Sequence, residues 1–243
     1  MNPLDGWTQG SHTFNGVTHD TYRKGTGPGV IVIHEIPGIS PPVIKFAEEV
    51  VGAGFTVVMP HLFGEPGGRV NLATVASAVR KVCVSNEFVT LHAGKTAPIA
   101  DWLRSRAREL HGELGGPGVG ALGMCFTGGF ALGMMVDPAV AAPVLCQPSA
   151  PFAVTPALGR DLGLSPSDLA TVKQRAANGC PVLGTRYSRD LAVGSRFDVL
   201  TKELGENFIK VEMPGVKHAT VTLHRQQVFV DAILDFFAKQ LKR

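Results

Sequence analysis

The pattern of apolar and polar residues along the chain predicts alternating strands and helices. Short unbroken runs rich in Val, Ile and Ala are typical of strands buried on both faces. Strand-like segments lie at residues 30–33, 55–59, 119–122, 140–145, 181–185 and 208–213. Segments with helical spacing lie between them, at residues 41–53, 71–110 (interrupted near Gly94 and Pro98), from 165 onward, 196–204 and 223–241. This order predicts the α/β class, with a mostly parallel central sheet and helices on both faces.

Two segments depart from this alternation. Residues 12–23 alternate weakly about the turn signal Asn15-Gly16 and are expected to form antiparallel edge strands. Residues 147–164 are rich in proline and show no period, so we expect a loop that covers the functional site. Because the alternation otherwise continues from one end of the sequence to the other, residues 1–243 are expected to form a single domain.

Composition and charge exclude several classes of partner. The 243 residues are 44% apolar with a formal net charge of +3, and basic residues form no cluster. The helical period places Arg104, Arg106 and Arg108 on the solvent face of the segment from Ile99 to Leu110. We therefore expect no binding to nucleic acid or to anionic membranes. The first residues do not resemble a signal peptide, and no apolar segment is long enough to span a bilayer.

The cysteines bear on the compartment and on cofactors. Four of them are scattered along the chain without a C-x-x-C pair, at positions 83, 125, 146 and 180. This distribution suits a reducing, cytoplasmic environment and argues against a disulfide scaffold or a structural zinc site. We expect neither a metal nor an organic cofactor.

A candidate nucleophile lies in the motif Gly123-Met124-Cys125-Phe126-Thr127-Gly128-Gly129. Apolar runs flank the motif, which predicts a strand, a tight turn and a helix with the cysteine at the apex. G-x-C-x-G-G is the cysteine version of the nucleophile elbow G-x-S-x-G. Small residues suit such a turn because neighbouring Cβ atoms would clash across it. The alternative is a tightly packed turn with an inert buried thiol.

A cysteine nucleophile needs a base and an acid that orients the base. His218, in a short loop between the last strand and the last helix, is the best placed of the histidines. Asp190 follows the strand at 181–185 and is the candidate acid. Asp198 is nearby but falls inside a predicted helix, which favours Asp190. The order nucleophile, acid, histidine is that of α/β-hydrolases.

Several stretches together resemble the dienelactone hydrolase family. They are the cysteine elbow, Val32-Ile33-His34-Glu35-Ile36-Pro37-Gly38 after one buried strand, Pro60-His61-Leu62-Phe63-Gly64 after the next, Asp190 and His218. The similarity extends from about residue 14 to the C-terminus. It implies a single domain with the α/β-hydrolase fold that hydrolyses an ester or lactone through an acyl-cysteine, without a cofactor.

The same resemblance suggests further roles. Glu35 matches the glutamate that helps to generate the thiolate when the substrate binds in this family. A carboxylate can accept a thiol proton once its own cationic partner is engaged by the substrate. The backbone N–H groups of Ile36 and Phe126 would form the oxyanion hole.

One departure from the family pattern concerns the substrate carboxylate. The dienelactone enzyme has an arginine shortly after its histidine that pairs with the glutamate and holds this carboxylate. The equivalent place here is near Thr222, and Arg225 lies further on. Arg225 could either face solvent or reach back to the site. Arg80, Arg189 and Arg225 are the candidate substrate-binding residues, so a carboxylate-bearing substrate stays an open question.

The sequence therefore predicts a hydrolase of the dienelactone hydrolase type acting on a lactone or small ester. One alternative is a carboxylesterase or thioesterase for uncharged acyl groups. Another is a non-catalytic ligand-binding protein or thiol sensor, because sensor cysteines also lie on exposed turns. The sequence does not determine the oligomeric state.

Overall fold

The computed structural model describes residues 3–88 and 93–242. Its strands are β1 (Thr8–Phe14), β2 (Val17–Lys24), β3 (Gly29–Ile33), β4 (Thr56–Pro60), β5 (Val119–Met124), β6 (Val140–Cys146), β7 (Val182–Tyr187) and β8 (Phe208–Met213). Its α-helices are α1 (Pro41–Gly52), α2 (Leu72–Val84), α3 (Ile99–Leu114), α4 (Gly128–Met134), α5 (Pro166–Ala177), α6 (Arg196–Leu204) and α7 (Gln227–Leu241). Short 3-10 turns occupy Cys125–Thr127, Leu158–Arg160 and Gly205–Asn207.

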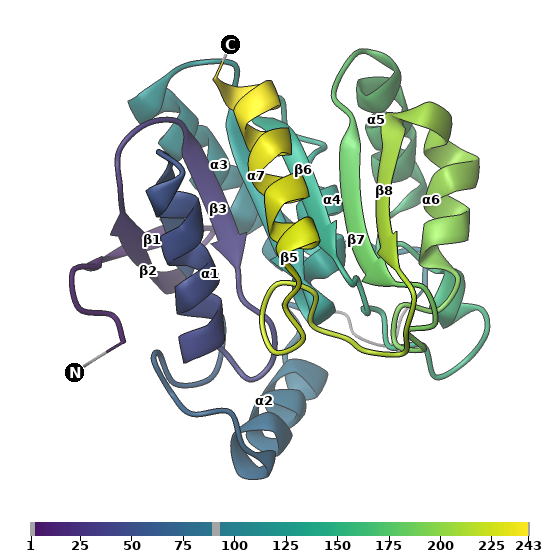
Figure 1. Ribbon diagram of the computed structural model, residues 1–243, viewed down its shortest axis with the longest axis horizontal. Helices are drawn as coiled ribbons and strands as arrows, with labels where there is room; N and C mark the ends of the chain where they lie inside the picture. The colour runs from purple at the N-terminus through teal and green to yellow at the C-terminus, as the bar shows by residue number, and fades with distance from the viewer. Residues whose placement is uncertain (1–2, 89–92, 243) are drawn as a thin grey trace.

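The described strands form one eight-stranded sheet in the order β1-β2-β4-β3-β5-β6-β7-β8. β2 pairs antiparallel with β1 and with β4, and the six strands from β4 to β8 in this order pair in parallel. Helices α1 and α7 cover one face, and α3 to α6 cover the other (Figure 1). The parallel strands end at one common edge, the lower edge in Figure 1, where the loops that carry chemistry meet.

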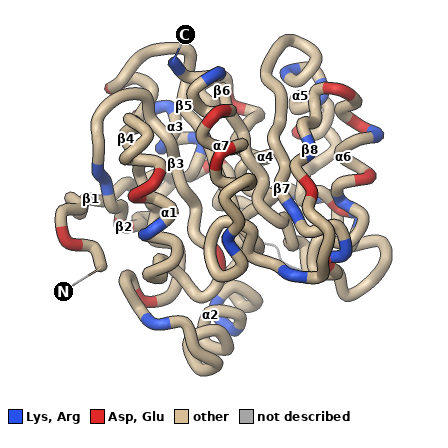
Figure 2. The backbone as a smooth tube through the Cα atoms, in the orientation of Figure 1, with Lys and Arg blue, Asp and Glu red and all other residues tan. Residues whose placement is uncertain are grey.

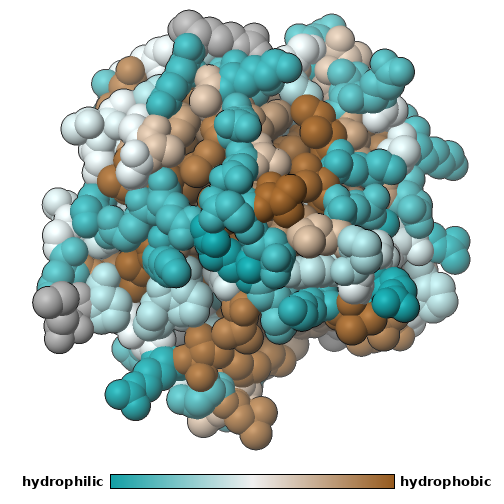
Figure 3. Space-filling model, in the orientation of Figure 1, coloured by the Kyte–Doolittle hydropathy of each residue, from teal (hydrophilic) through white to brown (hydrophobic). Residues whose placement is uncertain are grey.

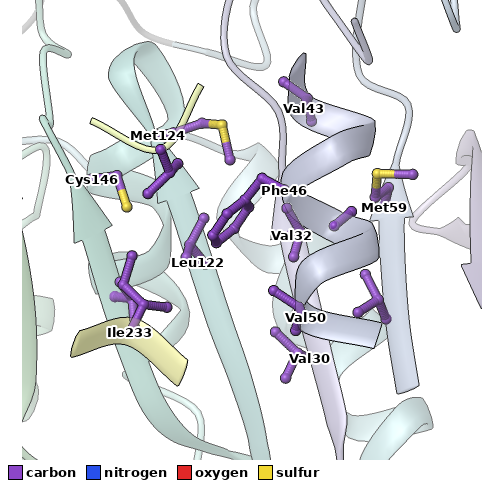
Figure 4. Close-up of a cluster of buried hydrophobic side chains, with 14 of the residues drawn as sticks. Val30, Val32, Val43, Phe46, Val50, Met59, Leu122, Met124, Cys146 and Ile233 are labelled. Atoms are coloured by element: carbon purple, nitrogen blue, oxygen red, sulfur yellow. The ribbon is translucent and has the colours of Figure 1, made fainter. Parts of the chain in front are cut away.

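Burial of apolar side chains holds these layers together. Figure 4 shows the cluster between the sheet and helices α1 and α7, to which β3 and β5 contribute Val30, Val32, Leu122 and Met124. Phe46 and Ile233 reach into the cluster from the two helices. Burying one such side chain is worth about 1.5–3 kcal/mol, so the cluster fixes the strands that precede the functional loops.

The α/β-hydrolase architecture expected from the sequence is confirmed, including the antiparallel edge strands around Asn15 and Gly16. Three details differ. Helix α2 already ends at Val84, well before the interruption expected near Gly94, and α3 continues to Leu114. Helix α7 begins at Gln227 rather than at residue 223, because the chain first makes turns there. Cys146 belongs to β6, one residue beyond the expected end.

The expectation that the three arginines of α3 face solvent is partly wrong. Arg108 is exposed, but Arg106 is buried with 6% of its surface accessible and pairs with Glu109. Arg104 is half-buried and donates to the carbonyl oxygen of Gly133 in α4. The helix is covered on two sides, by the β1–β2 hairpin and by α4, which the period of one isolated segment cannot reveal.

The surface seen in the view of Figure 2 carries charged positions of both signs, spread over the fold. Helix α2 is unusual because it stands away from the sheet at the lower edge (Figure 1). Only Ala78 and Val82 of this helix are buried, whereas Leu72 and Val84 are exposed. Figure 3 accordingly shows hydrophobic side chains gathered at this end of the molecule.

Candidate active site

Cys125 lies at the apex of the turn between β5 and α4. Its φ angle is 54°, in the left-handed region that non-glycine residues rarely adopt. A Cβ on Gly123 would lie 2.1 Å from the carbonyl oxygen of Thr127, and one on Gly128 would lie 2.6 Å from the Cα of Pro148. These two elbow positions therefore need glycine for space. At Gly129 the nearest atom would be 3.4 Å away, an ordinary contact.

The structure brings His218 and Asp190 to Cys125. The Nδ1 atom of His218 lies 2.5 Å from Oδ2 of Asp190, and the ring also makes a hydrogen bond with Cys125. The Asp190 side chain is only 4% exposed, and its Oδ1 accepts from the backbone N–H of Ala192. Burial lowers the pKa of His218, but the hydrogen bonds with Asp190 and Cys125 outweigh it and raise the pKa to about 10. The arrangement favours an imidazolium next to the sulfur.

Cys125 has a second neighbour that could stabilise a negative sulfur. Ser149 is buried, and its hydroxyl donates to Sγ of Cys125 over 3.4 Å. The Ser149 backbone N–H also donates to the carbonyl oxygen of Cys125 over 3.0 Å. Cys125 itself is half-buried, so it is not sealed in the core. By contrast, Cys146 is fully buried, and burial raises the pKa of its thiol to about 12.

Glu35 lies on the loop after β3, buried and held by neutral donors. Its Oε1 accepts from the Thr222 hydroxyl over 2.5 Å, and its Oε2 accepts from Nε2 of Gln147 over 3.4 Å. Burial raises the pKa of Glu35, and these hydrogen bonds, together with the nearby His218, offset only part of this increase. Thr222 thus holds the carboxyl group of Glu35 through a neutral hydroxyl.

Gln147 links three loops at this edge of the sheet. It follows β6, and its amide nitrogen donates to Glu35 while its Oε1 accepts from Thr220. Both the backbone N–H and the hydroxyl of Thr220 make this contact, over 3.1 and 2.6 Å. The Thr220 hydroxyl also lies 2.9 Å from that of Thr185 on β7. Sequence analysis did not identify Gln147, Ser149 or Thr220, because only their position after strands, shared with many residues, distinguishes them.

Backbone strain is concentrated at this site. Among described residues, four non-glycine residues have positive φ, and three of them are Cys125, Gln147 (35°) and Ala219 (55°). The fourth, Asn15, is in the β1–β2 hairpin, where asparagine is well tolerated. Strained backbone of this kind costs about 1–3 kcal/mol for each residue and clusters at functional sites.

The predicted oxyanion donors lie on two loops that point to the same edge. Among residues 3–88 and 93–242, the backbone N–H groups of Ile36 and Phe126 donate to no other protein atom. His34 fixes the first loop: its Nε2 accepts from the N–H of Leu62, so its Nδ1 donates to the carbonyl oxygen of Glu35. Burial lowers the pKa of His34 to about 3, which keeps this ring neutral.

The candidate substrate-binding arginines are placed apart from one another. Arg225 donates to Glu49 of α1 over 2.8 Å rather than to Glu35. Arg80 is exposed on α2, and Arg189 is exposed just before Asp190. A substrate contact by any of the three stays a prediction.

The loop at 147–164 is fixed at both its ends. Gln147, Pro148 and Ser149 pack against the elbow, as described above. Further along, the buried guanidinium of Arg196 donates to carbonyl oxygens of Pro151, Leu158 and Asp161. It also donates to those of Ala192 and Val193, in the loop that follows Asp190. This loop and the loop of Asp190 are therefore held as one unit.

Comparisons with known proteins agree with this picture. Residues 15–226 match the profile of the dienelactone hydrolase family. A dienelactone hydrolase from Anabaena variabilis superposes with a TM-score of 0.68 at 18% identity, covering 97% of this chain and 98% of the other. A cold-adapted esterase from an Arctic intertidal metagenomic library gives 0.59 at 16%, covering 96% and 92%. A dienelactone hydrolase-like promiscuous phosphotriesterase from metagenomic libraries gives 0.64 at 15%, covering 97% and 98%.

At these sequence identities the superpositions show a common fold, whereas the profile match over residues 15–226 shows the family. A search of curated proteins gave no match. In the part of the chain that the structure describes, every helix is too short or too polar to cross a membrane. The family match spans both the elbow and the loop between β8 and α7 that contains His218, called the histidine loop below. On this basis the chain belongs to the dienelactone hydrolase family, a family of hydrolases with the α/β-hydrolase fold.

Proposed function

We propose that the protein hydrolyses a lactone or small carboxylic ester through an acyl-cysteine, with Cys125, His218 and Asp190 as its catalytic triad. The observation that carries the proposal is the hydrogen-bonded row from Cys125 through His218 to Asp190 at the end of the parallel strands. A thiol is a few per cent ionised at neutral pH unless a base takes its proton, and His218 is in place to do so.

In the first half of the reaction His218 takes the proton of the Cys125 thiol. The thiolate attacks the carbonyl carbon, a C–S bond forms, and the carbonyl electron pair moves onto oxygen. The N–H groups of Ile36 and Phe126 stabilise this oxyanion. When the tetrahedral intermediate collapses, the ester C–O bond breaks and the leaving alkoxide takes the proton from His218.

In the second half, a water molecule replaces the alcohol. His218 removes a proton from the water, whose oxygen attacks the thioester carbon. Collapse of the second intermediate breaks the C–S bond and releases the acid, and the proton on His218 restores the thiol. Asp190 holds the imidazole in the required tautomer throughout. No cofactor takes part in these steps.

Two contacts favour uncharged substrates over carboxylate-bearing ones. Thr222 occupies Oε1 of Glu35, and Arg225 is paired with Glu49. An anionic substrate would thus meet a buried carboxyl group that a neutral hydroxyl holds. In this proposal Glu35 supports the histidine loop through its hydrogen bonds with Thr222 and Gln147.

The test is turnover of p-nitrophenyl acetate and of a panel of lactones. Cys125→Ala should abolish turnover, and brief reaction with the wild type should leave an acetyl group on the peptide that contains Cys125. Cys83→Ala removes an exposed thiol and is the matched control, with unchanged turnover expected. Turnover that persists in Cys125→Ala would refute the triad. Reaction with one equivalent of peroxide in an enzyme without turnover would favour the thiol sensor.

The substrate preference can be tested on the same enzyme. Neutral methyl esters should be hydrolysed with higher kcat/KM than the half-esters of dicarboxylic acids with the same chain length. Equal or reversed values would show that a cation reaches the substrate carboxylate after all. The variants Arg80→Ala, Arg189→Ala and Arg225→Ala would then identify the arginine that makes this contact.

A further inference from the structure

We propose that Gln147 is a positioning residue that fixes Glu35 and the histidine loop relative to each other and thereby sets the pH range over which Cys125 reacts. The inference rests on the proposed function in taking His218 as the base of Cys125. It goes beyond that function because it assigns the pH range to a side chain outside the triad.

The contacts of Gln147 use both ends of its amide. The nitrogen end donates to Oε2 of Glu35, on the loop after β3. The oxygen end accepts two hydrogen bonds from Thr220, two residues beyond His218. Because Gln147 is completely buried, no solvent can replace either partner without opening the site. One rigid amide therefore sets the separation of two loops that belong to different strands.

The backbone conformation of Gln147 holds its side chain between Glu35 and Thr220. Its φ of 35° is left-handed, and its N–H donates to the carbonyl oxygen of Thr185 on β7 over 2.7 Å. Two residues later the same loop supplies Ser149, whose hydroxyl reaches Cys125. A strained residue whose side chain and loop touch Glu35, the histidine loop and Cys125 is well placed to couple all three.

The amide is chemically specific at this position. Oε2 of Glu35 needs a donor, and the two Thr220 groups need an acceptor, so only an amide in this orientation satisfies both ends. The titratable groups that face Glu35 are His218 and His224 from the loop after β8 and the thiol of Cys146 from β6. His218 in turn faces Cys125 and Asp190. Arg225 does not join this set, because it is paired with Glu49.

Gln147→Glu tests the inference by replacing the donor with a second carboxyl group. A carboxyl pair at this distance shares one proton at low pH, which mimics the original hydrogen bond. At about pH 6 the variant should react within about 3-fold of the wild type, since this proton preserves the contact. As pH rises and the proton leaves, two carboxylates face each other and the loops separate. By pH 9, kcat for p-nitrophenyl acetate should be about 10²-fold below the wild type, with KM little changed.

Three further variants complete the experiment. Gln147→Leu removes both contacts without adding a titratable group, so kcat should fall by about 10–10², and the pH profiles of kcat and of Cys125 alkylation should shift because Glu35 and the loop of His218 are no longer held together. Gln174→Glu makes the same substitution at an exposed position on α5 and should overlay the wild type. Should Gln147→Glu not fold, Gln147→Asn replaces it, because the shorter amide cannot span from Glu35 to Thr220 and must lose kcat.

The pH dependence of Cys125 alkylation by iodoacetamide is the second readout, and it needs no substrate. Turnover that survives Cys125→Ala would refute the proposed function, while alkylation of Cys125 in the Gln147 variants would still test the present inference. Folded Gln147→Glu and Gln147→Leu proteins with wild-type kcat and wild-type alkylation profiles would overturn it. A purely structural Gln147 would lower the unfolding temperature and leave both pH profiles unchanged.

Discussion

The two edges of the parallel sheet solve the same problem of chain reversal in different ways. At the edge where strands begin, the left-handed residues just before β3, β4, β5, β7 and β8 are glycines, at positions 27, 54, 118, 179 and 205. At the edge where strands end, glycines also adopt this conformation, at positions 38, 64 and 215, but so do Cys125, Gln147 and Ala219, although they carry a Cβ. Glycine is the inexpensive choice for such turns. Strain is therefore accepted only where the loops direct side chains to Cys125.

The comparison also separates stability from chemistry. Two turns at the first edge close against backbone and cannot accept a side chain: a Cβ on Gly27 would lie 2.4 Å from the carbonyl oxygen of Gly54, and one on Gly118 would lie 2.7 Å from that of Ala139. At the second edge, buried polar groups such as Glu35, Gln147 and Asp190 are oriented by hydrogen bonds from other loops. Substitutions at the first edge should change the free energy of unfolding and leave the rate unchanged, whereas substitutions at the second should change the rate.

The largest effect is expected at the second edge, for Asp190→Asn. The amide removes the charge that, together with Cys125, raises the pKa of His218, so this pKa falls. With the imidazolium less stable beside the sulfur and the wrong tautomer favoured, kcat should fall by about 10³. Stopped-flow hydrolysis of p-nitrophenyl acetate measures this loss. A fall of less than 10-fold would remove Asp190 from the triad.

The same substitution predicts a pH dependence of stability. In the wild type the folded-state pKa of His218 is raised to about 10, so its contribution is full below the unfolded value of 6.5 and is lost as pH rises towards 10. The difference in unfolding free energy between the wild type and Asp190→Asn should therefore be largest near pH 6 and should shrink by pH 9.5. Urea unfolding at both pH values measures it, and a difference that grows with pH would contradict this sign.

The next effect belongs to the first edge, where Gly118→Ala should cost stability and leave the chemistry intact. Gly118 has a φ of 144°, and its added Cβ would also lie 2.9 Å from Cβ of Ala141. Strain and overpacking should cost about 2 kcal/mol of unfolding free energy, with kcat of the folded protein unchanged. Gly116→Ala is the control, because its φ is also positive but no atom lies within 4 Å of its Cβ, so it should cost about half as much. A kcat loss in Gly118→Ala would break the division between the edges.

The fold was predictable because local patterns and long-range packing agree. Val30 to Ile33 reads as a buried strand and lies in the centre of the sheet, and α6 and β8 begin and end where the pattern indicates. Arg106 shows the limit of prediction from local patterns. Its burial depends on contacts of α3 with the β1–β2 hairpin and with α4, which the helical period does not contain.

The candidate site was predictable only as far as single residues have distinctive neighbours in sequence. Cys125 stands in a glycine turn, and the order of Asp190 and His218 along the chain suggested the triad. Gln147 and Ser149 lie in an aperiodic loop, and their contacts with Glu35 and Cys125 arise from the meeting of loops far apart in sequence. The bond from Thr222 to Glu35 joins residues 187 positions apart, which no local pattern encodes.

The smallest effect, and the most direct test of the comparison, is expected for Ala219→Gly. Ala219 follows His218 with a φ of 55°, so glycine relieves strain there while giving up a buried methyl group and some backbone order. These contributions nearly cancel, and the unfolding free energy should change by less than about 0.5 kcal/mol. Ala107→Gly, at an equally small but helical and buried position in α3, should instead cost about 2 kcal/mol, because no strain is relieved.

The rates of these two variants should show the opposite order. A glycine next to His218 frees the imidazole, so Ala219→Gly should lower kcat about 3- to 10-fold, whereas Ala107→Gly should leave kcat unchanged in the folded protein. Chemical unfolding and p-nitrophenyl acetate hydrolysis on the same samples give both quantities. If Ala219→Gly loses as much stability as Ala107→Gly, the left-handed backbone at Ala219 is not strained. The edge where the strands end would then hold its side chains without the cost that distinguishes it from the other edge.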